Sequence, residues 1–198
     1  SFFLLAITLF AQKKTTPPPP LNPFISLDTF VNQMLTEWRV PGASVAIVKD
    51  GKLLYAKGYG LKDVKNNLPV TERTLFPIAS CTKSFTSAAL AILADEGKLD
   101  WNKPVKDYMP DFQLHDEYAT RTVTARDLVS HRTGLPRHDW TWLYANLDRQ
   151  SLYQRLKHLP LSKPVYAQYQ YNNLMFMTAG VLVEQKKKKS WENFLREK

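Results

Sequence analysis

The sequence has 198 residues, of which 44% are hydrophobic and 12% aromatic, and it carries a formal net charge of +9. This composition excludes a disordered or fibrous chain, and the length suffices for a globular domain with its own hydrophobic core. Four of the positive charges form the run Lys186 to Lys189, and most of the others are spread among acidic residues. A nucleic-acid site needs basic residues gathered on one face or a recognisable binding module, so we expect no nucleic-acid partner.

The first eleven residues, SFFLLAITLFA, form an apolar run that ends in a small residue. A membrane-spanning helix needs about 20 apolar residues, so we expect no stable membrane span here. The run is typical of the hydrophobic region and cleavage site of a secretory signal peptide. We therefore interpret residues 1–11 as a signal peptide remnant and expect an exported protein, periplasmic or secreted. The alternative is a buried segment of the mature fold.

Residues 12–22 include four consecutive prolines, which favour an extended conformation and exclude helix. They are predicted to form a linker, and residues 23–198 are predicted to form the folded domain. Within that domain, Ser26 is predicted to cap a helix, and Pro41-Gly42 is predicted to end that element. The apolar residues that share one face of this helix are Leu27, Phe30, Val31, Met34 and Leu35.

Residues 44–49 and 52–59 are two apolar-rich segments separated by Asp50-Gly51. An Asp-Gly pair between two such segments is a strong hairpin signal, because both turn residues adopt positive φ. We therefore predict an antiparallel hairpin, with Gly58 and Gly60 marking its end.

A longer helix is predicted from Ser80 to Glu96, with Gly97 placed to end it. Its shared apolar face consists of Phe85, Ala88, Ala89, Ile92 and Leu93. Residues 124–127, TARD, resemble a capping sequence for a short helix that ends at His131. A last helical face consists of Leu174, Met177, Thr178, Val181 and Leu182. Because two strands precede the helices without regular strand–helix alternation, we predict an α+β fold rather than a doubly wound one.

Ser80 and Lys83 form a Ser-x-x-Lys motif at the start of this longer helix. Residues at i and i+3 lie on the same face of a helix, so the lysine can reach the serine hydroxyl and accept its proton. The helix N-terminus also aims backbone N–H groups at a developing oxyanion. Taken alone the motif is weak, because a four-residue pattern with two free positions arises by chance.

Tyr171 and Asn173 form a second pattern, two residues apart, just before the last helix. In an extended segment their side chains point the same way. The phenol can share proton transfer with Lys83 if the lysine charge lowers the pKa of Tyr171, and the amide can hold Lys83 and a substrate amide. The alternative is a core tyrosine followed by a helix cap, for which Asn172 and Asn173 are both suitable.

Cys81 is the rival nucleophile, because thiolates attack more readily than hydroxyls. It follows Ser80 directly, so its side chain is turned by about 100° around the helix, away from the face that holds Lys83. We therefore interpret Cys81 as a small buried packing residue. It is the one cysteine of the sequence, which rules out an intramolecular disulfide.

Five stretches extend these motifs: PGASVAIVKDGK (41–52), LFPIASCTKSFTSAAL (75–90), AILADEGKLDWNKPV (91–105), ARDLVSHRTGLPRHD (125–139) and YNNLMFMTAG (171–180). Together, in this order, they resemble the serine β-lactamase and penicillin-binding-protein superfamily. The similarity is strongest to class C β-lactamases and to the related esterases and D-alanyl-D-alanine peptidases. It implies a β-lactamase/transpeptidase-like fold, an antiparallel sheet with a helical domain.

The resemblance implies that Ser80 is the acylated nucleophile and Lys83 its proton-accepting partner. Tyr171 would be the second base, which also protonates the leaving group, and Asn173 would hold the substrate amide. The backbone N–H of Ser80 would be one oxyanion donor, and His131 would have a structural role. The implied reaction is hydrolysis of an amide or ester bond in a β-lactam, a D-Ala-D-Ala peptide or a small ester, through an acyl-enzyme and without metal or cofactor.

The sequence departs from this family in two places. No Lys-Thr-Gly or His-x-Gly triplet follows Tyr171, and the run Lys186 to Lys189 stands where a turn with a glycine is expected. We therefore expect a domain truncated at its C-terminus, with strands missing and this 198-residue chain inactive. The alternatives are a non-catalytic β-lactamase-like binding domain and a basic surface-binding protein. The sequence leaves the oligomeric state open.

Overall fold

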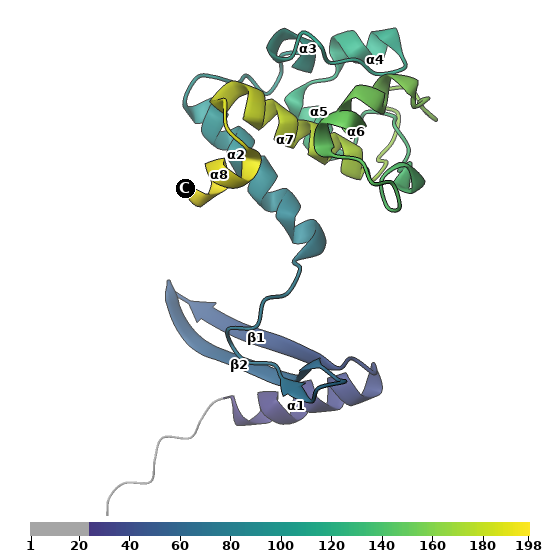
Figure 1. Cartoon of the computed structure of the whole chain (residues 1–198). Helices are drawn as coiled ribbons and strands as arrows, with labels where there is room; N and C mark the ends of the chain where they lie inside the picture. Colours follow the sequence, from purple (N-terminus) through teal and green to yellow (C-terminus); the bar gives the residue numbers. More distant parts are fainter. Residues whose placement is uncertain (1–23) are drawn as a thin grey trace, which may run out of the picture. The chain divides into compact units, whose positions relative to one another are not determined.

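A computed structural model describes residues 24–198 (Figure 1). The signal peptide and linker predicted for residues 1–11 and 12–22 lie outside the described residues. The described chain divides into two compact units after Pro77, and each is described by itself below. Among residues 24–198, no helix is long and apolar enough to cross a membrane.

The first unit contains helix α1 (Ile25–Glu37) and strands β1 (Gly42–Lys49), β2 (Lys52–Asp63) and β3 (Leu68–Pro69). The strands form one antiparallel sheet in the order β1-β2-β3. The hairpin prediction is confirmed, because β1 and β2 pair across a turn in which Asp50 and Gly51 have φ of 50° and 71°.

The prediction that Gly58 and Gly60 mark the end of the hairpin is confirmed, because the pairing of β1 with β2 ends at the pair Gly42–Gly60. Strand β2 continues beyond both glycines and then pairs with β3. A Cβ on Gly58 would lie 2.4 Å from the carbonyl oxygen of Val70, and one on Gly60, where φ is +65°, would lie 2.2 Å from that of Pro41. The glycines are therefore needed where neighbouring backbone approaches closely.

Helix α1 begins at Ile25, so the prediction that Ser26 is its cap was wrong. Ser26 lies inside the first turn, and the N-cap residue is Phe24. Of the predicted apolar face, Val31 is buried, whereas Phe30 is exposed. Apolar burial therefore accounts for only part of the attachment of α1 to the sheet (Figure 1).

The other part of that attachment is polar and centres on Asp28. Tyr55, Lys57 and Tyr59 alternate along β2, so their side chains leave the same face of the strand. Both phenols donate to Asp28 Oδ1 at 2.7 Å, and the Lys57 ammonium donates to Oδ2 at 2.8 Å. These hydrogen bonds, the Lys57 bond foremost, lower the pKa of Asp28 to about 2. Helix α1 is thus tied to β2 by a carboxylate that stays ionised.

The second unit, Ile78–Lys198, is helical. Its elements are η1 (Ala79–Cys81), α2 (Thr82–Asp95), α3 (Val105–Tyr108), α4 (Glu117–Thr122), α5 (Ala125–Ser130), η2 (Asp139–Thr141), α6 (Arg149–Arg155), η3 (Leu156–His158), α7 (Asn173–Lys187) and α8 (Trp191–Arg196). Helix α7 packs against α2, α5, α6 and α8 and is the centre of the unit (Figure 1).

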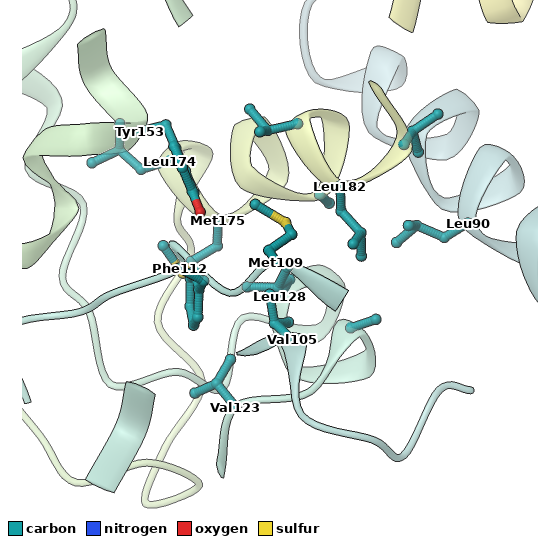
Figure 2. Close-up of a cluster of buried hydrophobic side chains, with 14 of the residues drawn as sticks. Leu90, Val105, Met109, Phe112, Val123, Leu128, Tyr153, Leu174, Met175 and Leu182 are labelled. Atoms are coloured by element: carbon teal, nitrogen blue, oxygen red, sulfur yellow. The ribbon is translucent and has the colours of Figure 1, made fainter. Parts of the chain in front are cut away.

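The core of the second unit surrounds α7. Leu90 of α2, Leu128 of α5 and Met175 and Leu182 of α7 are fully buried in one cluster (Figure 2). Burial of such a side chain contributes about 1.5–3 kcal/mol relative to leaving it in water. The antiparallel strands of the first unit and the helices of the second confirm the predicted α+β class. All the predicted site residues belong to the second unit.

The apolar face predicted for α2 is rotated from the one that the structure buries. The buried residues of α2 are Thr86, Ala89, Leu90 and Leu93, whereas Phe85 is exposed. Leu90 belongs to the same buried cluster as Met175 and Leu182 of α7, whereas Phe85 lies outside that cluster. The predicted end of the helix is confirmed, because Gly97 has φ of +67° and the next N–H, of Lys98, donates to Leu93 O at 2.8 Å.

Helix α5 begins and ends as predicted. The Thr124 hydroxyl accepts from the Asp127 N–H at 3.3 Å, and the Asp127 carboxylate accepts from the Thr124 N–H at 2.9 Å. This reciprocal capping box satisfies backbone donors at the helix start. His131 ends the helix with a left-handed φ of 60°, and this places its side chain toward the start of α7.

The run Lys186 to Lys189 has a structural explanation. Lys187 pairs with Glu96, Lys189 pairs with Glu197 at 2.7 Å, and the Lys186 ammonium lies 4.7 Å from the ring centroid of Tyr108. Lys188 ends α7 with a left-handed φ of 52°. It therefore occupies the helix-ending position that glycine usually takes.

We predict that Lys188→Gly stabilises the second unit. A non-glycine residue in the left-handed region costs about 1 kcal/mol or more, and glycine adopts that region without this cost. The free energy of unfolding, measured by urea denaturation, should therefore rise by about 1 kcal/mol.

The matched control is Lys186→Gly, which places glycine within α7 and should lower the free energy of unfolding by about 1 kcal/mol. If Lys188→Gly is as destabilising as this control, the left-handed helix end is not present in solution.

Candidate active site

Ser80 lies in the 3-10 turn η1, directly ahead of α2. The preceding residue, Ala79, has φ of +45°, a conformation that costs energy for a residue with a Cβ. Lys83 then falls one turn later, on the side of α2 that faces the start of α7.

The structure brings the four predicted site residues together. The Ser80 Oγ lies 2.5 Å from the Tyr171 Oη and accepts from the Lys83 Nζ at 3.1 Å. The Lys83 Nζ also donates to Asn173 Oδ1 at 2.7 Å. Lys83 therefore bridges the nucleophile candidate on one side and the first residue of α7 on the other. Ser80 itself is exposed, so its hydroxyl is accessible.

Asn172, between Tyr171 and Asn173, holds the backbone of both site residues in place at the start of α7. It is 1% exposed and caps α7 by accepting from the Met175 N–H at 2.9 Å. Its side-chain amide also donates to the carbonyls of Leu135 at 3.1 Å and Pro136 at 2.6 Å. The sequence offered Asn172 and Asn173 as alternative caps, and the structure selects Asn172. The carbonyl contacts were not predicted, because those partners are far away in the chain.

His131 packs directly behind the candidate base. Its ring centroid lies 4.7 Å from that of Tyr171 and 5.1 Å from that of Phe176, and its Nδ1 accepts from the Asn172 N–H at 3.0 Å. Burial, and then the positive charge of Lys83, lower the pKa of His131. The imidazole is therefore held neutral and accepts a hydrogen bond.

The pKa of Tyr171 lies below its ordinary value of 10.0. The hydrogen bond from Lys83 is the largest cause, followed by the one from Ser80, and the charges of Lys83 and Arg137 add to it. The Lys83 ammonium is 4.7 Å and the Arg137 guanidinium 5.1 Å from the Tyr171 ring centroid. Hydrogen bonds and cations that favour the phenolate make Tyr171 a better base for the serine proton.

Sequence reasoning did not single out Arg137 or Phe176. Arg137 follows the stretch TGLP, which was already part of the family resemblance, and its ion pair with Asp139 at 2.6 Å anchors it beside Tyr171. Phe176 lies one turn into α7 with its ring centroid 5.5 Å from the Lys83 ammonium. Its i+3 spacing from Asn173 was the one available signal.

The prediction that Cys81 is a buried packing residue was wrong, because its side chain is exposed. Cys81 belongs to the 3-10 turn η1, ahead of the part of α2 that packs on α7. Its carbonyl accepts from the Ser84 hydroxyl at 2.7 Å. The hydrogen-bonded set of Lys83, Tyr171 and Asn173 is assembled around the neighbouring serine instead.

A cavity of about 290 Å³ opens beside Lys83. Its walls come from α2, α6, α7 and α8 and are mainly apolar, including Phe176, Met177 and Trp191. Across residues 24–198, no group of three His, Cys, Asp or Glu side chains is placed to hold a metal ion.

The chain is similar to known proteins in both sequence and structure. The profile of the Beta-lactamase family matches residues 27–198. The chain is 41% identical over 165 residues to an unguisins hydrolase of Aspergillus campestris, covering 78% of this chain and 30% of that protein. It resembles the solved D-amino acid amidase of Ochrobactrum anthropi with 27% identity and a TM-score of 0.71, covering 87% of this chain and 50% of that one.

A second solved structure, the octameric penicillin-binding protein homologue of Pyrococcus abyssi, has 26% identity and a TM-score of 0.74. The match covers 87% of this chain and 41% of that one. The chain spans about a third of the length of the curated relatives it matches, 30% of the Aspergillus protein and 34% of protein flp from Staphylococcus aureus.

We predict that Asn172→Asp strongly destabilises the second unit. The carboxylate can still cap α7, but it cannot donate to the Leu135 and Pro136 carbonyls, and it places a buried charge against them. Unsatisfied buried groups cost about 1–3 kcal/mol each, so the free energy of unfolding should fall by roughly 2–5 kcal/mol.

The control is Asn102→Asp, at an exposed asparagine that accepts from Arg126 at 3.3 Å and keeps its acceptor after the change. It should alter the free energy of unfolding by less than about 0.5 kcal/mol. Equal urea denaturation midpoints for the two variants would show that Asn172 makes no such buried contacts.

Proposed function

The chain belongs to the Beta-lactamase family, and from this premise we propose that the protein is a serine hydrolase that cleaves an amide bond through an acyl-enzyme on Ser80. The family and the neighbouring structures are serine hydrolases of the β-lactamase type. One observation carries the proposal. The Ser80 hydroxyl lies within hydrogen-bond distance of both a phenol of lowered pKa and an amine, 2.5 Å from Tyr171 and 3.1 Å from Lys83.

In the first step, the Tyr171 phenolate accepts the proton of Ser80 while Oγ attacks the substrate carbonyl carbon. The Lys83 ammonium favours the phenolate beforehand, and it faces the negative charge that passes from the phenolate to the oxyanion. Asn173 holds Lys83 in place through its Oδ1 at 2.7 Å. The backbone N–H of Ser80, at the front of the 14-residue helix α2, is a candidate oxyanion donor.

In the second step, the bond from the carbonyl carbon to the leaving nitrogen breaks, and the Tyr171 phenol gives its proton to that nitrogen. The acyl group stays on Ser80 as an ester, and Tyr171 is a phenolate again. A water molecule then attacks the ester carbon and transfers a proton to Tyr171, which returns it to Ser80 Oγ as the acid departs. Protons balance over the cycle, and no cofactor is consumed.

The substrate is proposed from the relatives. The name of the D-amino acid amidase favours an amide substrate with a D-configured residue on the acyl side, and the name of the unguisins hydrolase favours a hydrolytic reaction. β-Lactams and small esters are the other substrates that this site chemistry can take. Residues 1–11 support a further proposal, that the protein is exported.

We predict that a fluorophosphonate probe labels Ser80 in the full-length protein, and that D-phenylalanine amide slows the labelling more than L-phenylalanine amide does. Peptide mass spectrometry should place the label on Ser80, and Ser80→Ala should abolish it. The matched control Ser84→Ala removes an exposed hydroxyl one turn further along α2, which donates to the Cys81 carbonyl, and should label at the wild-type rate. Label on Cys81, or equal labelling of Ser80→Ala, would refute the mechanism.

A further inference from the structure

His131 holds the chain on both sides of Tyr171. Its backbone carbonyl accepts from the Gln170 N–H at 2.8 Å, and its Nδ1 accepts from the Asn172 N–H at 3.0 Å. Between these two anchors, the imidazole lies against the Tyr171 ring, with centroids 4.7 Å apart and planes inclined by 39°. One residue therefore sets both the path of the backbone and the position of the phenol.

The Nδ1 contact requires a neutral imidazole. The Asn172 backbone N–H can only donate a hydrogen bond. The Nδ1 atom must therefore accept it with its lone pair, and the ring proton must be on Nε2. Protonation would place a second N–H against the Asn172 N–H and break the contact. Because the side chain is 7% exposed, water cannot easily replace the lost partner.

The groups that face the imidazole disfavour its protonation. Lys83 from α2 brings a positive charge, and the rings of Tyr169, Tyr171 and Phe176 cover the imidazole and shield it from water. Arg137 adds a second cation on the Tyr171 ring. Burial, and then Lys83, lower the pKa of His131 below 6.5.

We propose that His131 is a positioning residue that holds the Tyr171 hydroxyl against Ser80 only while its imidazole is neutral, so that acidification withdraws the base. This rests on the proposed function, in which Tyr171 takes the serine proton. A residue that merely fills space behind Tyr171 would be replaceable by any ring of similar size. A positioning residue needs an acceptor at the place of Nδ1.

The same protonation also affects folding, with a definite sign. Because the folded state has the lower His131 pKa, the unfolded chain binds the proton more readily. The contribution of His131 to stability is therefore complete above about pH 6.5 and is lost as the pH falls through that value toward the folded-state pKa. Every rate must accordingly be measured where circular dichroism shows the protein folded.

Two substitutions separate the roles. In His131→Asn, the Oδ1 takes the place of Nδ1, does not titrate, and belongs to a residue that tolerates the left-handed φ of 60°. In His131→Phe, the ring remains and the acceptor is lost. The matched control is His138→Asn, because His138 is also left-handed, with φ of 47°, but its Nε2 lies 3.3 Å from the Pro160 carbonyl instead.

The first readout is the rate of fluorophosphonate labelling at Ser80 as a function of pH. Wild-type protein and His138→Asn should lose rate on acidification through the His131 titration, whereas His131→Asn should lack that step. His131→Phe should lose about a hundredfold at neutral pH, the effect expected for a displacement of about 1 Å at the reacting group. Wild-type rates in His131→Phe, or an unchanged acid step in His131→Asn, would overturn the proposal.

The second readout does not depend on acylation. In protein with 13C-labelled tyrosine, the NMR resonance of the Tyr171 ring should shift with the His131 titration in wild type and not in His131→Asn. If wild-type Ser80 takes no label at any pH, the proposed function fails, and this NMR response still decides whether His131 positions Tyr171. A Tyr171 resonance that ignores the His131 titration would contradict the positioning role.

Discussion

The ammonium of Lys83, held between the Ser80 hydroxyl and the Asn173 amide oxygen, is the interaction on which the site depends. It links the start of α2 to the start of α7, the two helices that meet in the core of the second unit. Its charge lies 4.7 Å from the Tyr171 ring and lowers the pKa of that phenol. The Lys83 cation thus holds the Ser80 hydroxyl near the Tyr171 hydroxyl, and it also lowers the pKa of Tyr171 so that the phenolate can act as a base.

The position of the Lys83 ammonium depends on buried polar residues near it whose hydrogen bonds are formed within the protein. Asn172 caps α7 and binds two carbonyls, and His131 binds the N–H of Asn172. Both residues are buried at the edge of an apolar core, where an unpaired polar group would be costly. Stability and chemistry are therefore coupled, because the contacts that start helix α7 also aim Tyr171 and Asn173 at Lys83.

Local patterns predicted the local structure well. The Asp50-Gly51 turn and the Thr124–Asp127 capping box depend on neighbours in the sequence, and both are present. The errors concern contacts between distant segments. Periodicity located an apolar stripe on α2 but not which of its rows α7 would cover, and Phe85 is exposed. Nothing near Cys81 in the sequence indicated that its side chain would be exposed. The site residues were predicted as two local motifs. The contacts of Asn172 with two carbonyls and of Arg137 with the Tyr171 ring could not be predicted, because they join segments that are distant in the sequence.

The most direct test of this account is the ionisation of the Tyr171 phenol, followed by 13C NMR in wild type, Lys83→Met and Arg137→Gln. We predict a wild-type Tyr171 pKa below the ordinary value of 10.0, with most of the lowering lost in Lys83→Met and a smaller part in Arg137→Gln. A Tyr171 that titrates at its ordinary value in wild type, or that is unaffected by Lys83→Met, would show that the amine does not prepare this phenol as a base.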